Sequence, residues 1–174
     1  EFKALGAGGL CAVTGDALLV VVGGKDVPRT LDKALAALLA DALAHGDFEF
    51  KAGRCLYVHR PVGVAVKRLA FVAAADASAK AFKAAVAAGV GALKAMGVAE
   101  LVVARVGCDE ALDESHARAL VAAVADAVYV YRHTKPSAPA APKLARVTLF
   151  SAKKDAAALT RGLQRGQAVA SGVR

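Results

Sequence analysis

The sequence predicts an α/β domain with three layers, in which a mixed sheet lies between helices. Short apolar segments that are typical of buried strands alternate along the 174 residues with longer helical segments. Two strand segments, 54–59 and 68–73, are separated only by a short stretch that contains Pro61, so they can pair as an antiparallel hairpin. The alternation predicts parallel strands, and the hairpin makes the sheet mixed.

The strands of the N-terminal half are apolar runs next to glycine or proline. Phe2–Leu5 is a short candidate strand, and Ala17–Val22 (ALLVVV) is a continuous apolar run before Gly23 and Gly24. A continuous run of this length predicts a strand that is buried on both faces. A helix follows, because apolar residues recur with a helical period until Gly46. These residues are Leu31, Leu35, Leu38, Leu39 and Ala42.

The next part of the chain continues the alternation with a capped helix and a further strand. Ser78 suits the N-cap of a helix over 79–96, and Gly97 suits its end. A strand is predicted at 100–105, where LVVA forms the apolar centre.

Two helices are predicted in the last third, with a linker and a strand between them. The first of these helices begins at Asp113 or Ser115. The segment 136–142 (PSAPAAP) predicts an extended, polar linker, Arg146–Phe150 alternates like a strand, and Ser151 suits the N-cap of the final helix. The apolar side of the first helix is formed by Leu120, Val121, Val124, Val128 and Tyr131.

The charge of the chain is distributed unevenly. The formal net charge is +8, yet residues 1–131 hold fourteen basic and fourteen acidic residues, so the excess lies in 132–174, where Asp155 is the one acid. This asymmetry indicates either a site for a polyanion such as DNA or a surface that docks on another part of the protein. The candidate contact residues are Lys143, Arg146, Lys153, Lys154, Arg161 and Arg165.

Few residues are candidates for metal binding or catalysis. Cys55 and His59 lie four apart on a predicted strand and share a face, but a metal would need two further ligands. Cys108 precedes two acids, 109–110, which disfavour the thiolate that a nucleophile requires. The acids of the segment GCDEALDE (107–114) fit the first turn of the next helix, and we expect His116 on that same surface turn.

The remaining signals concern phosphate binding and location. Gly23 and Gly24 follow a strand and fit either a turn or a loop that cradles phosphate, without the spacing of a P-loop or a dinucleotide fingerprint. The sequence has neither a signal peptide nor an apolar run of about 18 residues, so we expect no membrane contact. Cys11, Cys55 and Cys108 are far apart, which predicts free thiols and a cytoplasmic protein.

Several segments carry a resemblance to a known family over nearly the whole chain. They are RLAFVAAAD, AFKAAVAAGVGALKAMGVAELVV, AVYVYRHTK, RVTLF and GLQRGQAVASGVR, and the most specific are Tyr-x-Tyr-x-x-x-Lys at 129–135 and Gly-x-x-x-Gly-x-x-x-Ala at 162–170. In this order they resemble the N-terminal domain of the leucyl (cytosol) aminopeptidases. Ala73, Ala74 and Ala75 stand where that family usually has glycines, which argues against a loop function that needs close backbone approach there.

The resemblance implies a macro-domain-like fold and a division of the chain. Residues 1–150 would form the N-terminal α/β domain, and 151–174 would begin a connector helix towards a catalytic domain. That domain would bind two divalent metal ions, Zn or Mn, and carry the string NTDAEGRL, which this sequence lacks. The apolar stripe of the last helix continues to Val173 without a stop signal, as expected of an N-terminal domain separated from its catalytic domain.

The function implied by the resemblance is that of a non-catalytic domain. It would serve hexamer assembly and access to the active site of a metal-dependent aminopeptidase, with its own catalytic domain and sister subunits as partners. This chain alone is then not an enzyme. Two alternatives remain open. One is a nucleic-acid-binding module that uses the basic C-terminal quarter, since some bacterial members contribute to DNA binding. The other is a macro-like ADP-ribose binder.

Overall fold

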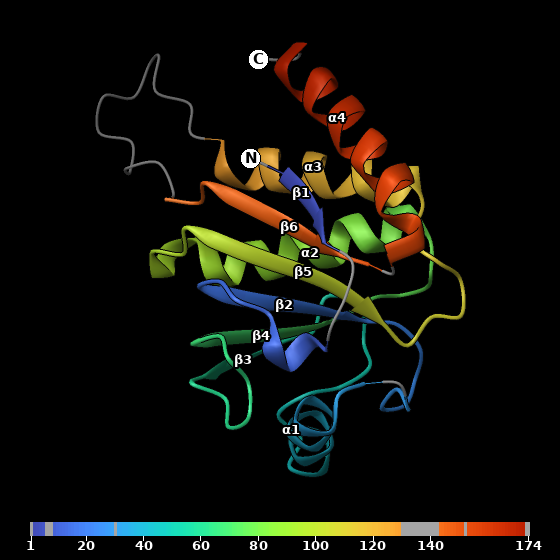
Figure 1. Ribbon diagram of the computed structural model, residues 1–174. Coiled ribbons are helices and arrows are strands. Elements are labelled where there is room, and N and C mark those ends of the chain that lie inside the picture. Colours follow the sequence, from blue (N-terminus) through green and yellow to red (C-terminus); the bar gives the residue numbers. More distant parts are fainter. Residues whose placement is uncertain (1, 6–8, 30, 130–142, 152, 173–174) are drawn as a thin grey trace.

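A computed structural model describes residues 2–5, 9–29, 31–129, 143–151 and 153–172 (Figure 1), with the backbone alone for 2–5 and 153. The strands are β1 (Phe2–Leu5), β2 (Ala17–Val22), β3 (Cys55–His59), β4 (Arg68–Ala73), β5 (Glu100–Val106) and β6 (Arg146–Phe150). The α-helices are α1 (Lys33–Ala44), α2 (Ala79–Leu93), α3 (Glu114–Val128) and α4 (Ala156–Gly172). The 3₁₀ turns are η1 (Leu10–Ala12), η2 (Lys94–Met96) and η3 (Lys153–Asp155).

The described strands form one mixed sheet in the order β1-β6-β5-β2-β4-β3. All neighbours pair in parallel except β3 and β4, which are antiparallel, with Tyr57 opposite Ala70. The predicted hairpin and the mixed sheet are therefore confirmed. Helix α1 covers one face of the sheet, and α2, α3 and α4 lie on the other (Figure 1), which gives the predicted three layers.

The core lies on both sides of the central strand β2, whose residues are all buried. Leu19 and Val21 belong to the apolar cluster beneath α2, α3 and α4. Leu18, Val20 and Val22 belong to the cluster beneath α1. Because successive side chains of a strand point to opposite faces, a strand between two helix layers needs apolar residues at every position.

The local signals for the helix ends are mostly confirmed. The Ser78 hydroxyl accepts a hydrogen bond from the backbone N–H of Ala81 at 3.1 Å, and Gly97 has a φ of 70°, which favours glycine. The final helix differs from the prediction, because Ser151 is followed first by η3 and the α-helix begins only at Ala156. The predicted linker 136–142, Tyr131 and Val173 lie outside the described residues. Within the described part of the chain, each helix is too short or too polar to cross a bilayer.

Candidate functional site

The N-terminal ends of α2 and α3 meet the end of β5 in a hydrogen-bonded junction around His116. Asp113 caps α3, because its carboxylate accepts from the backbone N–H of His116 at 3.1 Å, and the two side chains lie 2.8 Å apart from Nδ1 to Oδ1. On the other side of the ring, Nε2 lies 2.8 Å from the carbonyl oxygen of Ala77 and 3.0 Å from the guanidinium of Arg105. Arg105 also donates to the carbonyl oxygens of Ala77 and Glu110.

The expectation that His116 lies on the surface is wrong. Its exposed fraction is 6%, and its ring packs edge-on against Phe82 with the ring centroids 5.7 Å apart. Burial of the Asp113 carboxyl opposes ionisation, yet the hydrogen bonds from His116 outweigh it and lower the pKa of Asp113 below its ordinary value. Among the described residues every buried side-chain nitrogen or oxygen has a partner. The junction therefore has a structural role, joining two helices to the sheet.

The glycines after β2 are explained by packing between loops. A Cβ atom at Gly23 would overlap the Sγ atom of Cys108, and one at Gly107 would overlap the carbonyl oxygen of Gly23. Close packing between the loops after β2 and β5 therefore accounts for Gly23. Burial raises the pKa of the Cys108 thiol above its ordinary value, which disfavours the thiolate.

The remaining chemical candidate, Cys55 with His59, lies on the edge strand β3. Burial raises the pKa of Cys55, and His59 is exposed with its Nδ1 atom 3.2 Å from the Tyr57 hydroxyl. In the ranges that the structure describes, His, Cys, Asp and Glu side chains form no group of three that could hold a metal ion.

The structure separates the basic candidate residues into two sets at opposite ends of β6. Lys143 and Arg146 lie at its start, whereas Lys154, Arg161 and Arg165 follow its end and are exposed on η3 and α4. A five-residue strand spans about 16 Å, which separates Lys143 and Arg146 from Lys154. The side chain of Lys153 lies outside the described part of the structure.

Two members of these sets already bind carboxylates. The guanidinium of Arg146 lies 3.3 Å from a carboxylate oxygen of Glu100. The guanidinium of Arg165 lies 2.7 Å from a carboxylate oxygen of Glu114 and thereby links α4 to α3. Part of the basic charge is therefore balanced within the chain.

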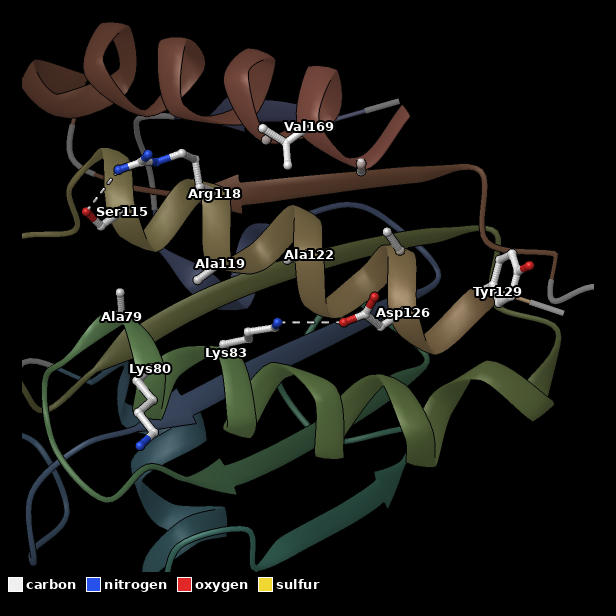
Figure 2. Close-up of a pocket in the computed structure, with 13 residues that line it drawn as sticks. Ala79, Lys80, Lys83, Ser115, Arg118, Ala119, Ala122, Asp126, Tyr129 and Val169 are labelled. Atoms are coloured by element: carbon white, nitrogen blue, oxygen red, sulfur yellow. Dashed lines mark hydrogen bonds and ion pairs between the residues drawn. The ribbon is translucent and has the colours of Figure 1, made fainter. Parts of the chain in front are cut away.

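A groove that the sequence does not reveal runs along α3 between α2 and α4 (Figure 2) and encloses about 850 Å³. We call it the α3 groove. Its α2 side is lined by Ala79, Lys80 and Lys83, its α4 side by Gly166, Val169 and Ala170, and its α3 side by Ser115, Arg118, Ala119, Ala122, Ala125, Asp126 and Tyr129.

The lining of the α3 groove is largely apolar, with charges on its rim. The ammonium of Lys83 lies 3.6 Å from a carboxylate oxygen of Asp126, and Arg118 donates to the Ser115 hydroxyl at 3.4 Å. Tyr129 and Val169 are 55% and 65% exposed. The sequence offers one signal for this groove, which is the spacing of alanines opposite the apolar side of α3. The groove itself forms only where α2, α3 and α4 pack side by side.

The comparisons with known proteins agree on one family. A family model described as "Cytosol aminopeptidase family, N-terminal domain" matches residues 17–137. A "Probable cytosol aminopeptidase" of Methylibium petroleiphilum is 51% identical over 164 residues, which cover 94% of this chain and 33% of that protein. Its counterpart in Polaromonas naphthalenivorans is 36% identical over 152 residues, which cover 86% of this chain and 29% of that protein. The chain thus spans about a third of the length of these relatives.

The fold has a solved counterpart. A structure of a tomato leucine aminopeptidase mutant matches with a TM-score of 0.74 and 18% sequence identity, covering 99% of this chain and 36% of that one. This likeness confirms the predicted fold class, and the family match confirms the resemblance to the N-terminal domain.

Proposed function

The chain belongs to the cytosol aminopeptidase family, and we propose that it acts as the non-catalytic N-terminal domain of a metal-dependent leucyl aminopeptidase. The observation that carries this proposal is the family match, which concerns the N-terminal domain and extends over about a third of the relatives' length. The described residues offer no cluster of ligands that fits the implied Zn or Mn ions. We propose that the two metals bind a catalytic domain in the part of the relatives' length that this chain does not cover.

The proposed division assigns 1–150 to the domain and 151–174 to the start of a connector helix. Its support is the change in burial along α4. Leu159 and Leu163 are buried against the domain, whereas Val169 is largely exposed. A helix whose first turns are buried against the domain and whose last described residues, Ser171 and Gly172, are exposed is suited to link two domains.

The proposed role is to hold sister subunits together in a hexamer and to limit access to the active site. A domain with its own core contributes to such an enzyme through the surfaces that it presents. We propose a cytoplasmic location, which the names of the relatives and the three free cysteines support.

The enzymatic part of the proposal is tested on this chain with added Mn²⁺, Zn²⁺ or Mg²⁺. We expect no hydrolysis of leucine p-nitroanilide, and hydrolysis by contaminant-free protein would refute a non-catalytic role.

The assembly role is tested on the Methylibium relative with and without its matched third. Loss of the hexameric mass in light scattering is expected, with retained binding of two metals as the control for folding. An unchanged mass together with unchanged selectivity between short and long peptides would contradict the assembly role.

A second candidate function is weak, sequence-independent binding of duplex DNA through η3 and α4. It is supported by Lys154 and Arg161, which are exposed and have no ion-pair partner among the described residues. Arg165 would join them by leaving Glu114. If two to four cations contact phosphates, the logarithm of the binding constant should fall against the logarithm of the salt concentration with a slope of about −2 to −4.

The experiment is a salt series with a random duplex and the variant Lys154→Glu/Arg161→Glu/Arg165→Glu. The matched control, Lys25→Glu/Lys51→Glu/Lys67→Glu, makes the same change in net charge at exposed residues outside η3 and α4. We expect the first variant to lose binding and the control to keep most of it. Equal losses would indicate that net charge alone attracts the DNA.

A further inference from the structure

We propose that the junction around His116 is a proton-operated switch, in which the Nε2 atom of the ring exchanges Arg105 for the carbonyl oxygen of Ala77 when the ring becomes protonated. All of its groups lie within this chain, so the inference goes beyond the proposed assembly role and does not depend on it. It is supported by the burial of the ring, the partners of its two nitrogens, and the charges around it.

His116 combines burial with the chemistry of an imidazole. It is the one buried residue with a polar or charged side chain in the part of the chain that the structure describes. Histidine is also the side chain whose ordinary charge change falls between about pH 5 and 8. A buried ring cannot turn to water when it gains a proton, so the protein groups that touch it must accommodate the change. The partners of the two ring nitrogens therefore decide what protonation does to the junction.

The Nδ1 atom has one role, that of a donor. It lies 2.8 Å from the Oδ1 atom of Asp113 and 3.3 Å from the backbone nitrogen of the same residue. Burial opposes ionisation of the Asp113 carboxyl, yet hydrogen bonds from His116 lower its pKa, so this carboxyl is ionised at neutral pH. Without a proton, the lone pair of Nδ1 would face that carboxylate at the shorter of the two distances. The proton on Nδ1 is therefore present in both states of the ring.

The Nε2 atom, by contrast, has two partners that need opposite states of the ring. It lies 3.0 Å from a guanidinium nitrogen of Arg105, which can only donate, and 2.8 Å from the carbonyl oxygen of Ala77, which can only accept. The neutral ring accepts from Arg105 through the lone pair of Nε2. The protonated ring has an N–H there, which donates to Ala77 and leaves Arg105 without its acceptor on the ring. One proton thus replaces one partner by the other.

The exchange changes which element holds α3. Arg105 has further acceptors, because it also donates to the carbonyl oxygens of Ala77 and Glu110. It can therefore leave the ring and remain hydrogen-bonded. In the neutral state the ring joins α3 to strand β5 through Arg105. In the protonated state it joins α3 to Ala77, the residue before the N-cap of α2. The proton moves the attachment of α3 from the sheet to the start of the neighbouring helix.

Charges of both signs surround the ring. The Asp113 carboxylate attracts a protonated ring, and the Arg105 guanidinium repels it. On its α2 side the ring packs against Phe82, which carries no charge. The adjacent loops carry one thiol and three carboxyl groups, and α3 carries a further carboxyl group that binds Arg165 of α4. These residues are Cys108, Asp76, Asp109, Glu110 and Glu114. Because Arg105 is the cation in contact with the ring, its removal should favour the protonated state.

The experiment follows the imidazole and guanidinium nitrogens of the ¹⁵N-labelled full chain by NMR between about pH 5 and 8, with His116→Gln to assign the signals of the ring. At the upper end we expect a proton on Nδ1 and none on Nε2. As the pH falls, Nε2 should gain a proton, and the guanidinium signals of Arg105 should change with the same midpoint. The exposed His59 is the internal control, and its titration should leave the Arg105 signals unchanged.

A variant of Arg105 tests the exchange itself. Arg105→Gln removes the cation that repels the protonated ring and should move the midpoint of the His116 titration upward by about half a pH unit or more. Arg118→Gln makes the same change in charge at an exposed residue of α3 and should move it by less than half as much.

Four results would each overturn the proposal. They are a proton on Nε2 throughout the pH range, no titration of His116, Arg105 signals that do not follow the titration, and equal shifts in the two variants. The first three are measured on the original protein, so the test holds even if Arg105→Gln fails to fold.

Discussion

The two faces of the sheet are covered by different means. On one face the single helix α1 is held by large side chains, since Leu35, Leu39 and Phe48 are exposed by 1% or less. On the other face, helices approach where glycines leave room. A Cβ atom at Gly89 would overlap the side chain of Leu19, and one at Gly162 would lie 2.7 Å from the carbonyl oxygen of Glu114 in α3. The layer formed by α1 is stabilised by large buried side chains. The layer formed by α2, α3 and α4 depends on close approach between backbones.

The helices on the two faces also differ in whether a side chain caps their N-terminal end. Side chains cap α2 and α3 through Ser78 and Asp113, whereas the N-cap of α1, Asp32, forms no side-chain cap. A helix of twelve residues is marginal in water without such support. The stability of α1 must therefore come mainly from its packing on the sheet.

The largest effect that this comparison predicts is on the α1 face. Leu39→Ala should lower the free energy of unfolding by about 3–4 kcal/mol, because it leaves a cavity in a fully buried site. Chemical denaturation measures the change. The half-buried neighbour Leu38 is the control, and Leu38→Ala should cost about 1 kcal/mol. Equal costs for the two leucines would refute the dependence of α1 on buried volume.

The next effect concerns close approach on the three-helix face. Gly162→Ala should destabilise the protein by about 2 kcal/mol, because the added methyl group meets backbone atoms of Glu114 that cannot move aside. Gly91→Ala is the matched control, since nothing lies within 4 Å of its added Cβ. This control should stabilise the protein by about 0.5–1 kcal/mol through helix propensity. The same chemical change should thus have opposite signs at the two sites, and a stabilising Gly162→Ala would disprove the close contact.

The features predicted correctly from the sequence are those with local signals. The strand β2 is a continuous apolar run, the hairpin partners are separated by a short segment, and Ser78 and Gly97 mark the ends of a helical pattern. The burial of His116 escaped prediction, because its partners Arg105 and Ala77 come from other elements of the chain. The α3 groove was not predicted either, because residues of three different helices line it.

For the basic residues, too, the sequence predicts the local feature and not the contacts between distant segments. Their excess in the last quarter is evident from the sequence, but the sequence does not indicate that β6 separates Lys143 from Lys154. Neither does it indicate that Arg165 binds Glu114 in α3. Charge counts describe a segment, whereas a binding surface depends on where the fold places each side chain.

A smaller, pH-dependent loss of stability is expected when the side chain that caps α3 is removed. Asp113→Ala should cost about 1 kcal/mol at neutral pH, because the backbone N–H of His116 loses its acceptor. The folded protein holds the pKa of Asp113 below its ordinary value. The stabilisation is therefore complete above the unfolded pKa of about 3.9 and is lost as the pH falls through the lower, folded pKa.

The control for this prediction is a cap that does not titrate. Ser78→Ala should also cost about 1 kcal/mol, with little change between neutral and acidic pH. The measurement is the free energy of unfolding of the original protein and both variants across this range. A cost of Asp113→Ala that persists at the acidic end would show that ionisation of the carboxyl contributes nothing to the cap.

The smallest effect separates charge from close packing between α3 and α4. Arg165 and Glu114 pair at 2.7 Å, but their side chains are 66% and 30% exposed, so water and salt screen the attraction. A double-mutant cycle with Arg165→Gln and Glu114→Gln should give a coupling energy of about 0.5 kcal/mol, which falls further at high salt. Gly162→Ala should cost several times more, because it forces the two backbones apart at every salt concentration. If the coupling instead equals the cost of Gly162→Ala, α4 is held on α3 by charge, and the distinction between the two faces of the sheet fails at this helix.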